Sequence, residues 1–244
     1  MLDQLNNLTD ASTAKAPPQD MSASRRLRWF ELALLLSIAV GPYFLSSIHL
    51  LITGQATAPS APEFRWTSSL LHEVTALLLL GYILSRRKVR FVDLGLRWSL
   101  FDLTSGLGLV IVSYCAYYAG YIVVHTIHHA IFGAAQGGVT AQAAFGHPGI
   151  SAIPFVLLNP FFEELIVRAY LMTEIKELTG SVTLSIALSV AVQTTYHLYY
   201  GWEGALSLGF QFLVFALYYA VTRKATPIIV AHSAFDLFFL FRLW

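Results

Sequence analysis

The sequence predicts an all-α protein, a polytopic transmembrane bundle of seven to eight helices. Hydrophobic residues make up 56% of its 244 residues and charged residues only 12%, and the mean hydropathy is +0.62. A soluble domain carries about a quarter charged residues, so this chain has too few charges to cover a water-exposed surface. The net charge of +1 excludes a nucleic-acid partner bound through bulk basicity.

Apolar runs of about 20 residues, the length of a membrane-spanning helix, cover most of the chain. They lie near 29–52, 66–84, 103–127, 149–175, 181–200, 204–222 and 225–243. Basic residues flank them on alternating sides, at Arg25–Arg28, Arg86–Arg90, Lys176 and Arg223–Lys224. Because loops rich in Lys and Arg stay in the cytoplasm, the pattern predicts seven spans with a cytoplasmic N-terminus. We expect an integral protein of the bacterial inner (plasma) membrane.

The first 24 residues differ from the rest in composition. They are polar, they include Pro17–Pro18, and they lack the apolar side chains needed for a packed core. We therefore expect a disordered cytoplasmic tail over 1–24 and one transmembrane domain over 25–244. Residues 132–148, rich in Gly and Ala, are expected to form an outer loop.

The run 149–175 contains a predicted break. Asn159 followed by Pro160 is typical of a helix start, with Asn as the N-cap and Pro in the first turn. We expect a short apolar segment up to Leu158, either re-entrant or a separate helix, and a new helix from Pro160. This places Glu163 near the outer start of its helix, whereas His232 lies deeper, so the site requires a cavity that reaches toward the middle of the bilayer.

Two carboxylates and a guanidinium follow this break in an apolar stretch. Ionisable residues inside a membrane are costly, and they indicate a functional site. Glu164 and Arg168 are four residues apart and share a helix face, which predicts a structural ion pair. Glu163 lies about 100° away around the helix and has no local cation, so it is the candidate proton acceptor.

Further ionisable residues fall in other spans. His197 closes the fifth span, and His232 and Asp236 lie four apart, on one face, in the seventh. Glu73, in the second span, either lines the cavity or extends its carboxylate toward the interface between helices. His125, His128 and His129 have a spacing that can hold a metal, but without an acidic partner nearby in the sequence a wet interfacial position is favoured.

Three of these motifs together resemble the CAAX-protease and bacteriocin-processing (CPBP) family of intramembrane proteases. The motif Glu-Glu-x-x-x-Arg is matched by Glu163, Glu164 and Arg168; a second motif centres on His197; and a third, His-x-x-x-Asn/Asp, is matched by His232 and Asp236. The resemblance covers about 150–240. The family often has Phe where this chain has Gln193, which we expect to line the cavity.

The resemblance implies hydrolysis of a peptide bond in a membrane-anchored protein or peptide. It implies that Glu163 activates water with the help of His197, while His232 and Asp236 stabilise the oxyanion. An ionised Asp cannot donate a hydrogen bond, so Asp236 either is protonated or orients His232. We favour a mechanism without a metal; if zinc is present, the expected ligands are Glu163, His197 and His232.

Two other functions remain open at this point. The same intramembrane charges could form the path of a proton- or cation-coupled transporter, although the two halves of the chain show no convincing similarity. A non-catalytic membrane scaffold could also retain the motifs for packing.

Overall fold

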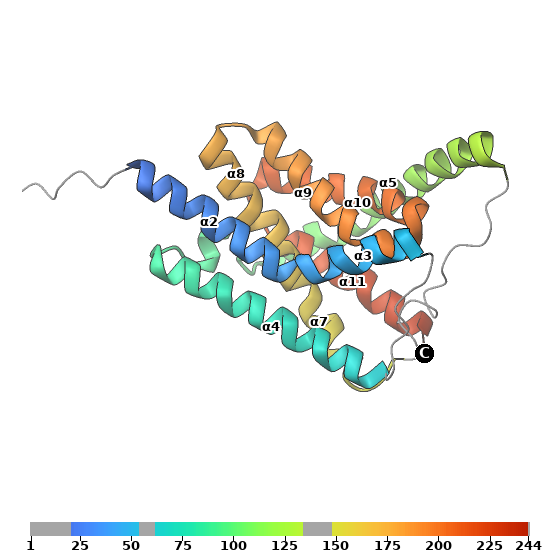
Figure 1. Ribbon diagram of the computed structural model, residues 1–244, viewed down its shortest axis with the longest axis horizontal. Helices are drawn as coiled ribbons and strands as arrows, with labels where there is room; N and C mark the ends of the chain where they lie inside the picture. Colours follow the sequence, from blue (N-terminus) through green and yellow to red (C-terminus); the bar gives the residue numbers. More distant parts are fainter. Residues whose placement is uncertain (1–20, 54–61, 134–147, 244) are drawn as a thin grey trace, which may run out of the picture.

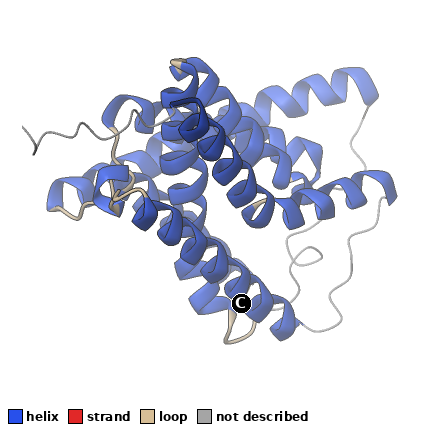
Figure 2. Cartoon of the chain, turned by 60° about the vertical axis from the view of Figure 1, so that its left-hand side comes forward, coloured by secondary structure: helices blue, strands red, loops and turns tan. Residues whose placement is uncertain are grey.

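The computed structural model describes residues 21–53, 62–133 and 148–243, and this part of the chain is built of helices without strands. Figure 2 shows these helices, several of them joined by short loops. The α-helices are α2 (Met21–Ala39), α3 (Gly41–Thr53), α4 (Pro62–Arg86), α5 (Leu100–Phe132), α7 (Ala152–Glu163), α8 (Leu171–Thr179), α9 (Val182–Tyr196), α10 (Gly201–Thr222) and α11 (Thr226–Leu243). The predicted all-α fold is confirmed.

Each predicted apolar run falls on helical structure. Three helical stretches are long and apolar enough to cross a membrane, at Phe64–Arg86, Leu100–Phe132 and Leu198–Thr222. The count rises to four if α2 and α3, which are bent by 52°, form one span. The protein is therefore a multi-pass membrane protein, and the seven to eight spans and the cytoplasmic N-terminus stay predictions.

The predicted helix break before Pro160 is wrong. α7 begins at Ala152 and continues to Glu163 with Pro160 inside it. A π-helical segment, η3 (Glu164–Tyr170), and then α8 follow without a gap. Proline removes one backbone hydrogen bond, and neighbouring helices together with local π-helical widening make such a residue tolerable inside a membrane helix. The segment before Pro160 is thus the first part of one long, widened helix.

This correction changes the depth of the acidic residues. Glu163 is the last residue of α7, and at 1.5 Å per residue it lies about 16 Å from the helix start. The sequence had placed it in the first turn of a helix, far from the level of His232. Because α7 is continuous, the acidic residues and His232 can meet inside the bundle.

Ion pairs join α2, α8 and the end of α4 at one end of the bundle, on the left of Figure 1. Arg28 of α2 donates to Glu174 of α8 at 2.9 Å. Arg87, just after α4, pairs with Glu174 at 2.8 Å and also with Glu31 of α2. The start of α2 and the ends of α4 and α8 therefore lie together, as expected if the basic segments face the same side of the membrane.

Helix α5 packs closely against α10 and α11 because it carries glycine at two contacts. A Cβ atom on Gly106 would lie 2.7 Å from the side chain of Val230, and one on Gly120 would lie 2.5 Å from the ring of Phe210. These distances are too short for a side chain. The glycines thus allow α5 to approach α11, which carries His232 and Asp236, and α10, which precedes it.

Two sequence-based expectations concern regions that the structure covers only in part. The predicted disordered tail over 1–24 lies mostly outside the described residues, and α2 already begins at Met21. Most of the predicted outer loop, residues 134–147, also lies outside them. Both expectations stay predictions.

Candidate active site

The two glutamates and the arginine of the first motif lie in the interior of the bundle, at the junction of α7 and η3. Glu164 and Arg168 are 0% exposed and Glu163 is 5% exposed. Oε2 of Glu164 lies 3.6 Å from Nε of Arg168, within ion-pair distance but beyond a hydrogen bond. The π-helical winding of η3 still brings these two side chains together, as their spacing predicts.

Helix α9 supplies the other partners of the arginine. Arg168 donates through Nη1 to Oγ of Ser189 at 2.8 Å and through Nη2 to Oε1 of Gln193. The guanidinium therefore has one anionic partner and two neutral acceptors. Such a set of hydrogen bonds is what a buried charge requires, because an unsatisfied buried cation is strongly destabilising.

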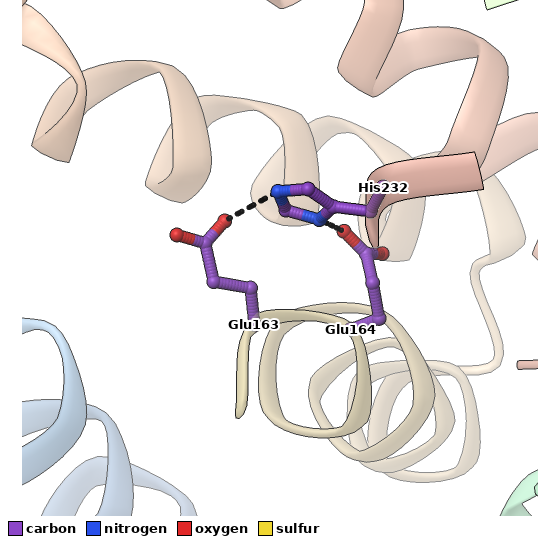
Figure 3. A group of neighbouring side chains, drawn as sticks. All are labelled: Glu163, Glu164 and His232. Atoms are coloured by element: carbon purple, nitrogen blue, oxygen red, sulfur yellow. Dashed lines mark hydrogen bonds and ion pairs between the residues drawn. The ribbon is translucent and has the colours of Figure 1, made fainter. Parts of the chain in front are cut away.

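His232 of α11 lies between the two glutamates, as Figure 3 shows. Its Nδ1 is 2.8 Å from Oε1 of Glu164, and its Nε2 is 3.9 Å from Oε2 of Glu163. The ring is 6% exposed. The histidine within ion-pair distance of the candidate base is therefore the one of the third motif, 69 residues further along the chain.

Asp236 extends this cluster, and Asn159 joins it. Oδ1 of Asp236 is 3.5 Å from Nε2 of His232, and Oδ2 accepts a hydrogen bond from Nδ2 of Asn159 at 3.0 Å. The sequence predicts only a helix-capping role for Asn159. The sequence does carry a signal that Asn159 belongs to the site. Asn159 and Glu163 are four residues apart and so share a face of α7.

His197, just after α9, is buried close to this cluster but makes different contacts. Its Nδ1 lies 2.8 Å from the backbone oxygen of Gln193; since a carbonyl only accepts, Nδ1 carries the hydrogen. The ring packs against Tyr196 and Phe212, with centroids 4.6 and 4.9 Å away. Among the described residues, no hydrogen bond or ion pair joins His197 to Glu163 directly.

Gln193 connects Glu163, Arg168 and His197. Its Nε2 donates to Oε2 of Glu163 at 2.6 Å, its Oε1 accepts from Arg168, and its backbone oxygen accepts from His197. The side chain is 0% exposed. A residue expected only to line the cavity thus holds the candidate base by a direct hydrogen bond.

Glu73 of α4 is fully buried, and neither of its carboxylate oxygens has a hydrogen-bond partner in the described part of the chain. It lies close enough to Glu163 and Asp236 for electrostatic interaction with both. Its neighbour His72 lies with Nε2 3.0 Å from the backbone oxygen of Ala39. Glu73 is therefore buried near the cluster, and its role in lining a cavity stays a prediction.

The residues that could hold a metal differ from the expected set. Within the described residues, Glu163, Glu164 and His232 can bring their ligand atoms within 4.8 Å of one another; Glu164 takes the place expected for His197. Carboxylate oxygen and imidazole nitrogen are ligands that zinc accepts. Glu164, however, already has Arg168 at 3.6 Å and the Nδ1 of His232 at 2.8 Å, and both would compete with an ion.

The fold and the site together define a multi-pass membrane protein with a buried carboxylate–histidine cluster. Residues 146–238 match the family described as type II CAAX prenyl endopeptidase Rce1-like. This range includes all three motifs and confirms the family resemblance of that part of the chain, although it covers less than half of the whole. A search of curated proteins and a search of solved structures gave no significant match.

Proposed function

We propose that the protein is an intramembrane endopeptidase that hydrolyses a peptide bond in a membrane-associated substrate. The observation that carries the proposal is the cluster of buried Glu163, Glu164 and His232 with half-buried Asp236, assembled from two distant segments. The family match supports a CAAX-type intramembrane protease in general. Three carboxylates around one imidazole in a membrane interior are costly to keep for packing alone.

Glu163 is the proposed general base. Its Oε2 accepts a hydrogen bond from Gln193 at 2.6 Å and lies 3.9 Å from His232. Glu164 is held more tightly, because it contacts both Arg168 and His232. It removes a proton from water as the water oxygen attacks the scissile carbonyl carbon. When the tetrahedral intermediate collapses, the C–N bond breaks and the proton passes to the leaving amine.

His232 and its neighbours are the proposed oxyanion side. Glu164 fixes Nδ1 of His232, which directs Nε2 toward the space beside Glu163 and Asp236. Asp236 accepts from Asn159 and orients the imidazole, as an ionised aspartate can. An ionised Asp236 has no hydrogen to donate to an oxyanion. The side-chain amide of Asn159 has a second N–H, which can donate in its place. Donors fixed before the reaction, in a site with little water, stabilise a developing oxyanion strongly.

The remaining motif residues support this arrangement. Arg168 neutralises Glu164 and is held by α9. His197 is a positioning residue in this proposal, because its Nδ1–H binds the backbone of Gln193, the residue that holds the base. No step requires a metal. If zinc were bound, Glu163, Glu164 and His232 would hold it, and it would lower the pKa of a bound water.

A cleavage assay with purified protein in proteoliposomes tests the proposal. The substrates are membrane-anchored peptides, with and without a prenyl group, and the variant is Glu163→Gln. Glu177→Gln, a change of an exposed acid on α8, is the matched control. Cleavage by the wild type and the control but not by Glu163→Gln is expected. A proton or cation flux that Glu163→Gln abolishes, without cleavage of any peptide, would establish a transporter instead.

A further inference from the structure

Glu73 of α4 is a buried acid near the catalytic cluster, and no step of the proposed mechanism uses it. It is 0% exposed. Within the described residues, neither of its carboxylate oxygens has a hydrogen-bond partner, and no Lys, Arg or His pairs with it. Leaving a buried polar group without a partner costs about 1–3 kcal/mol. An acid kept at this cost inside a membrane indicates a function.

The packing of α4 against α7 places Glu73 at the level of Glu163. The two helices lie side by side (Figure 1). Two ring contacts join them: Trp66 with Phe155 at 5.2 Å, and His72 with Phe162 at 6.0 Å. From the first contact to the second, both helices advance in the same direction by a similar number of residues, so they run parallel and in step. Glu73 and Glu163, which directly follow the second contact, therefore lie at the same depth in the bundle.

The groups that face Glu73 are two other acids and a phenol. Glu73 interacts electrostatically with Glu163 of α7 and Asp236 of α11, and Tyr43 of α3 interacts with Glu73 and Glu163 alike. Three ionised carboxylates at close range in a low-dielectric interior repel one another strongly. A carboxyl group in such a place, without a cation, keeps its proton and can then act as a hydrogen-bond donor.

The surroundings of Glu163 and Glu73 divide the roles of acid and base between them. Oε2 of Glu163 accepts a hydrogen bond from Gln193 at 2.6 Å and lies 3.9 Å from His232, and both contacts stabilise an ionised carboxylate. Glu73 has neither kind of contact in the described part of the chain, which stabilises the neutral acid. Two carboxyl groups held in opposite protonation states are suited to general acid–base catalysis.

We propose that Glu73 is the catalytic acid of the site, which donates its proton to the oxygen of the scissile carbonyl; this rests on the proposed endopeptidase function. As Glu163 takes a proton from water, the water oxygen bonds to the carbonyl carbon. The π electrons of the C=O bond move to the carbonyl oxygen, which takes the proton of Glu73. On collapse of the tetrahedral intermediate that proton returns to Glu73, the C–N bond breaks, and the proton on Glu163 passes to the leaving nitrogen.

Cleavage kinetics of three variants of the full-length protein in proteoliposomes test this role. Glu73→Gln and Glu73→Leu should each lower kcat by about 10²-fold or more, as the loss of a general acid does, with little change in KM. Both should melt close to the wild type, because each replaces a neutral side chain by a neutral one of similar size. Glu177→Gln, which changes an exposed acid, should behave as the wild type. An unchanged kcat in both Glu73 variants would overturn the proposal.

Infrared difference spectra of the same preparations report the protonation of Glu73 independently of cleavage. The difference between the wild type and Glu73→Gln should contain the C=O stretch of a neutral carboxylic acid, and that between the wild type and Glu177→Gln the bands of an ionised carboxylate. An ionised carboxylate at Glu73 would overturn the proposal even if the protein cleaves peptides.

The two proposals fail in different ways. Cleavage that Glu163→Gln abolishes and that both Glu73 variants retain at the wild-type kcat would refute the role of Glu73 and support the endopeptidase function. Absence of cleavage by the wild type would refute the endopeptidase function and the acid role with it, whatever the infrared bands show.

Discussion

Replacing each of the two adjacent glutamates by glutamine separates a chemical role from a structural one. Glu164 is 0% exposed, and its two oxygens face Arg168 at 3.6 Å and His232 at 2.8 Å. The amide of Glu164→Gln can still accept from His232, but it offers Arg168 no charge. Breaking a buried ion pair by removing one partner costs about 3–5 kcal/mol.

We expect Glu164→Gln to fall at the lower end of this range, about 3 kcal/mol, because Arg168 keeps its hydrogen bonds to Ser189 and Gln193. For a chain of this size that loss lowers the melting temperature by about 6–12 °C. Glu163→Gln should melt close to the wild type, since an amide oxygen can still accept from Gln193. Its turnover should fall by about 10²-fold or more, because the amide cannot take a proton.

Thermal unfolding in detergent and peptide cleavage in proteoliposomes measure the two effects on the same preparations. Glu177→Gln is the control, since an exposed ion pair contributes about 1 kcal/mol or less. A stable but inactive Glu164→Gln together with an active Glu163→Gln would reverse the assignment within the motif. Equal melting of all three variants would refute the structural role of the Glu164–Arg168 pair.

Four further outcomes are expected. Gln193→Met should lower turnover more than it changes KM, because it frees the Glu163 carboxylate; an unchanged kcat would contradict the positioning role. His232→Gln should lose activity by about 10²-fold or more while His197→Gln keeps part of it, and the reverse order in the cleavage assay would return the partner role to His197. Asp236→Asn should be tolerated, since its amide oxygen still accepts from Asn159, whereas Asp236→Leu should not; equal rates for the two would exclude an orienting role. In a Cys115→Ser background, an impermeant thiol reagent should label a cysteine at Gln136 from outside and spare one at Ser85, and equal labelling would refute the predicted topology.

The positions of the helices and the identity of the intramembrane charges could be predicted from the sequence. The apolar runs fall on the described helices because hydrophobic length and periodicity are local properties of the chain. The Glu164–Arg168 contact was also predictable, since a spacing of four residues places two side chains together in a helix. The three motifs and their order were sufficient for the family resemblance, which the match over 146–238 confirms.

The partners of the site residues were decided by the tertiary structure. Asn159–Pro160 has the local pattern of a helix start, but α7 runs through it because its neighbours in the bundle and the π-helical segment accommodate the proline. That continuity sets the depth of Glu163 and allows His232 to reach it.

The contacts between His232 and Glu164 and between Asp236 and Asn159 join residues 68 and 77 positions apart. Helical periodicity reports which residues share a face of one helix, but it carries no information on which face of another helix lies opposite. Only the packing of the helices brings Gln193 to the carboxylate of Glu163 and His232 to Glu164.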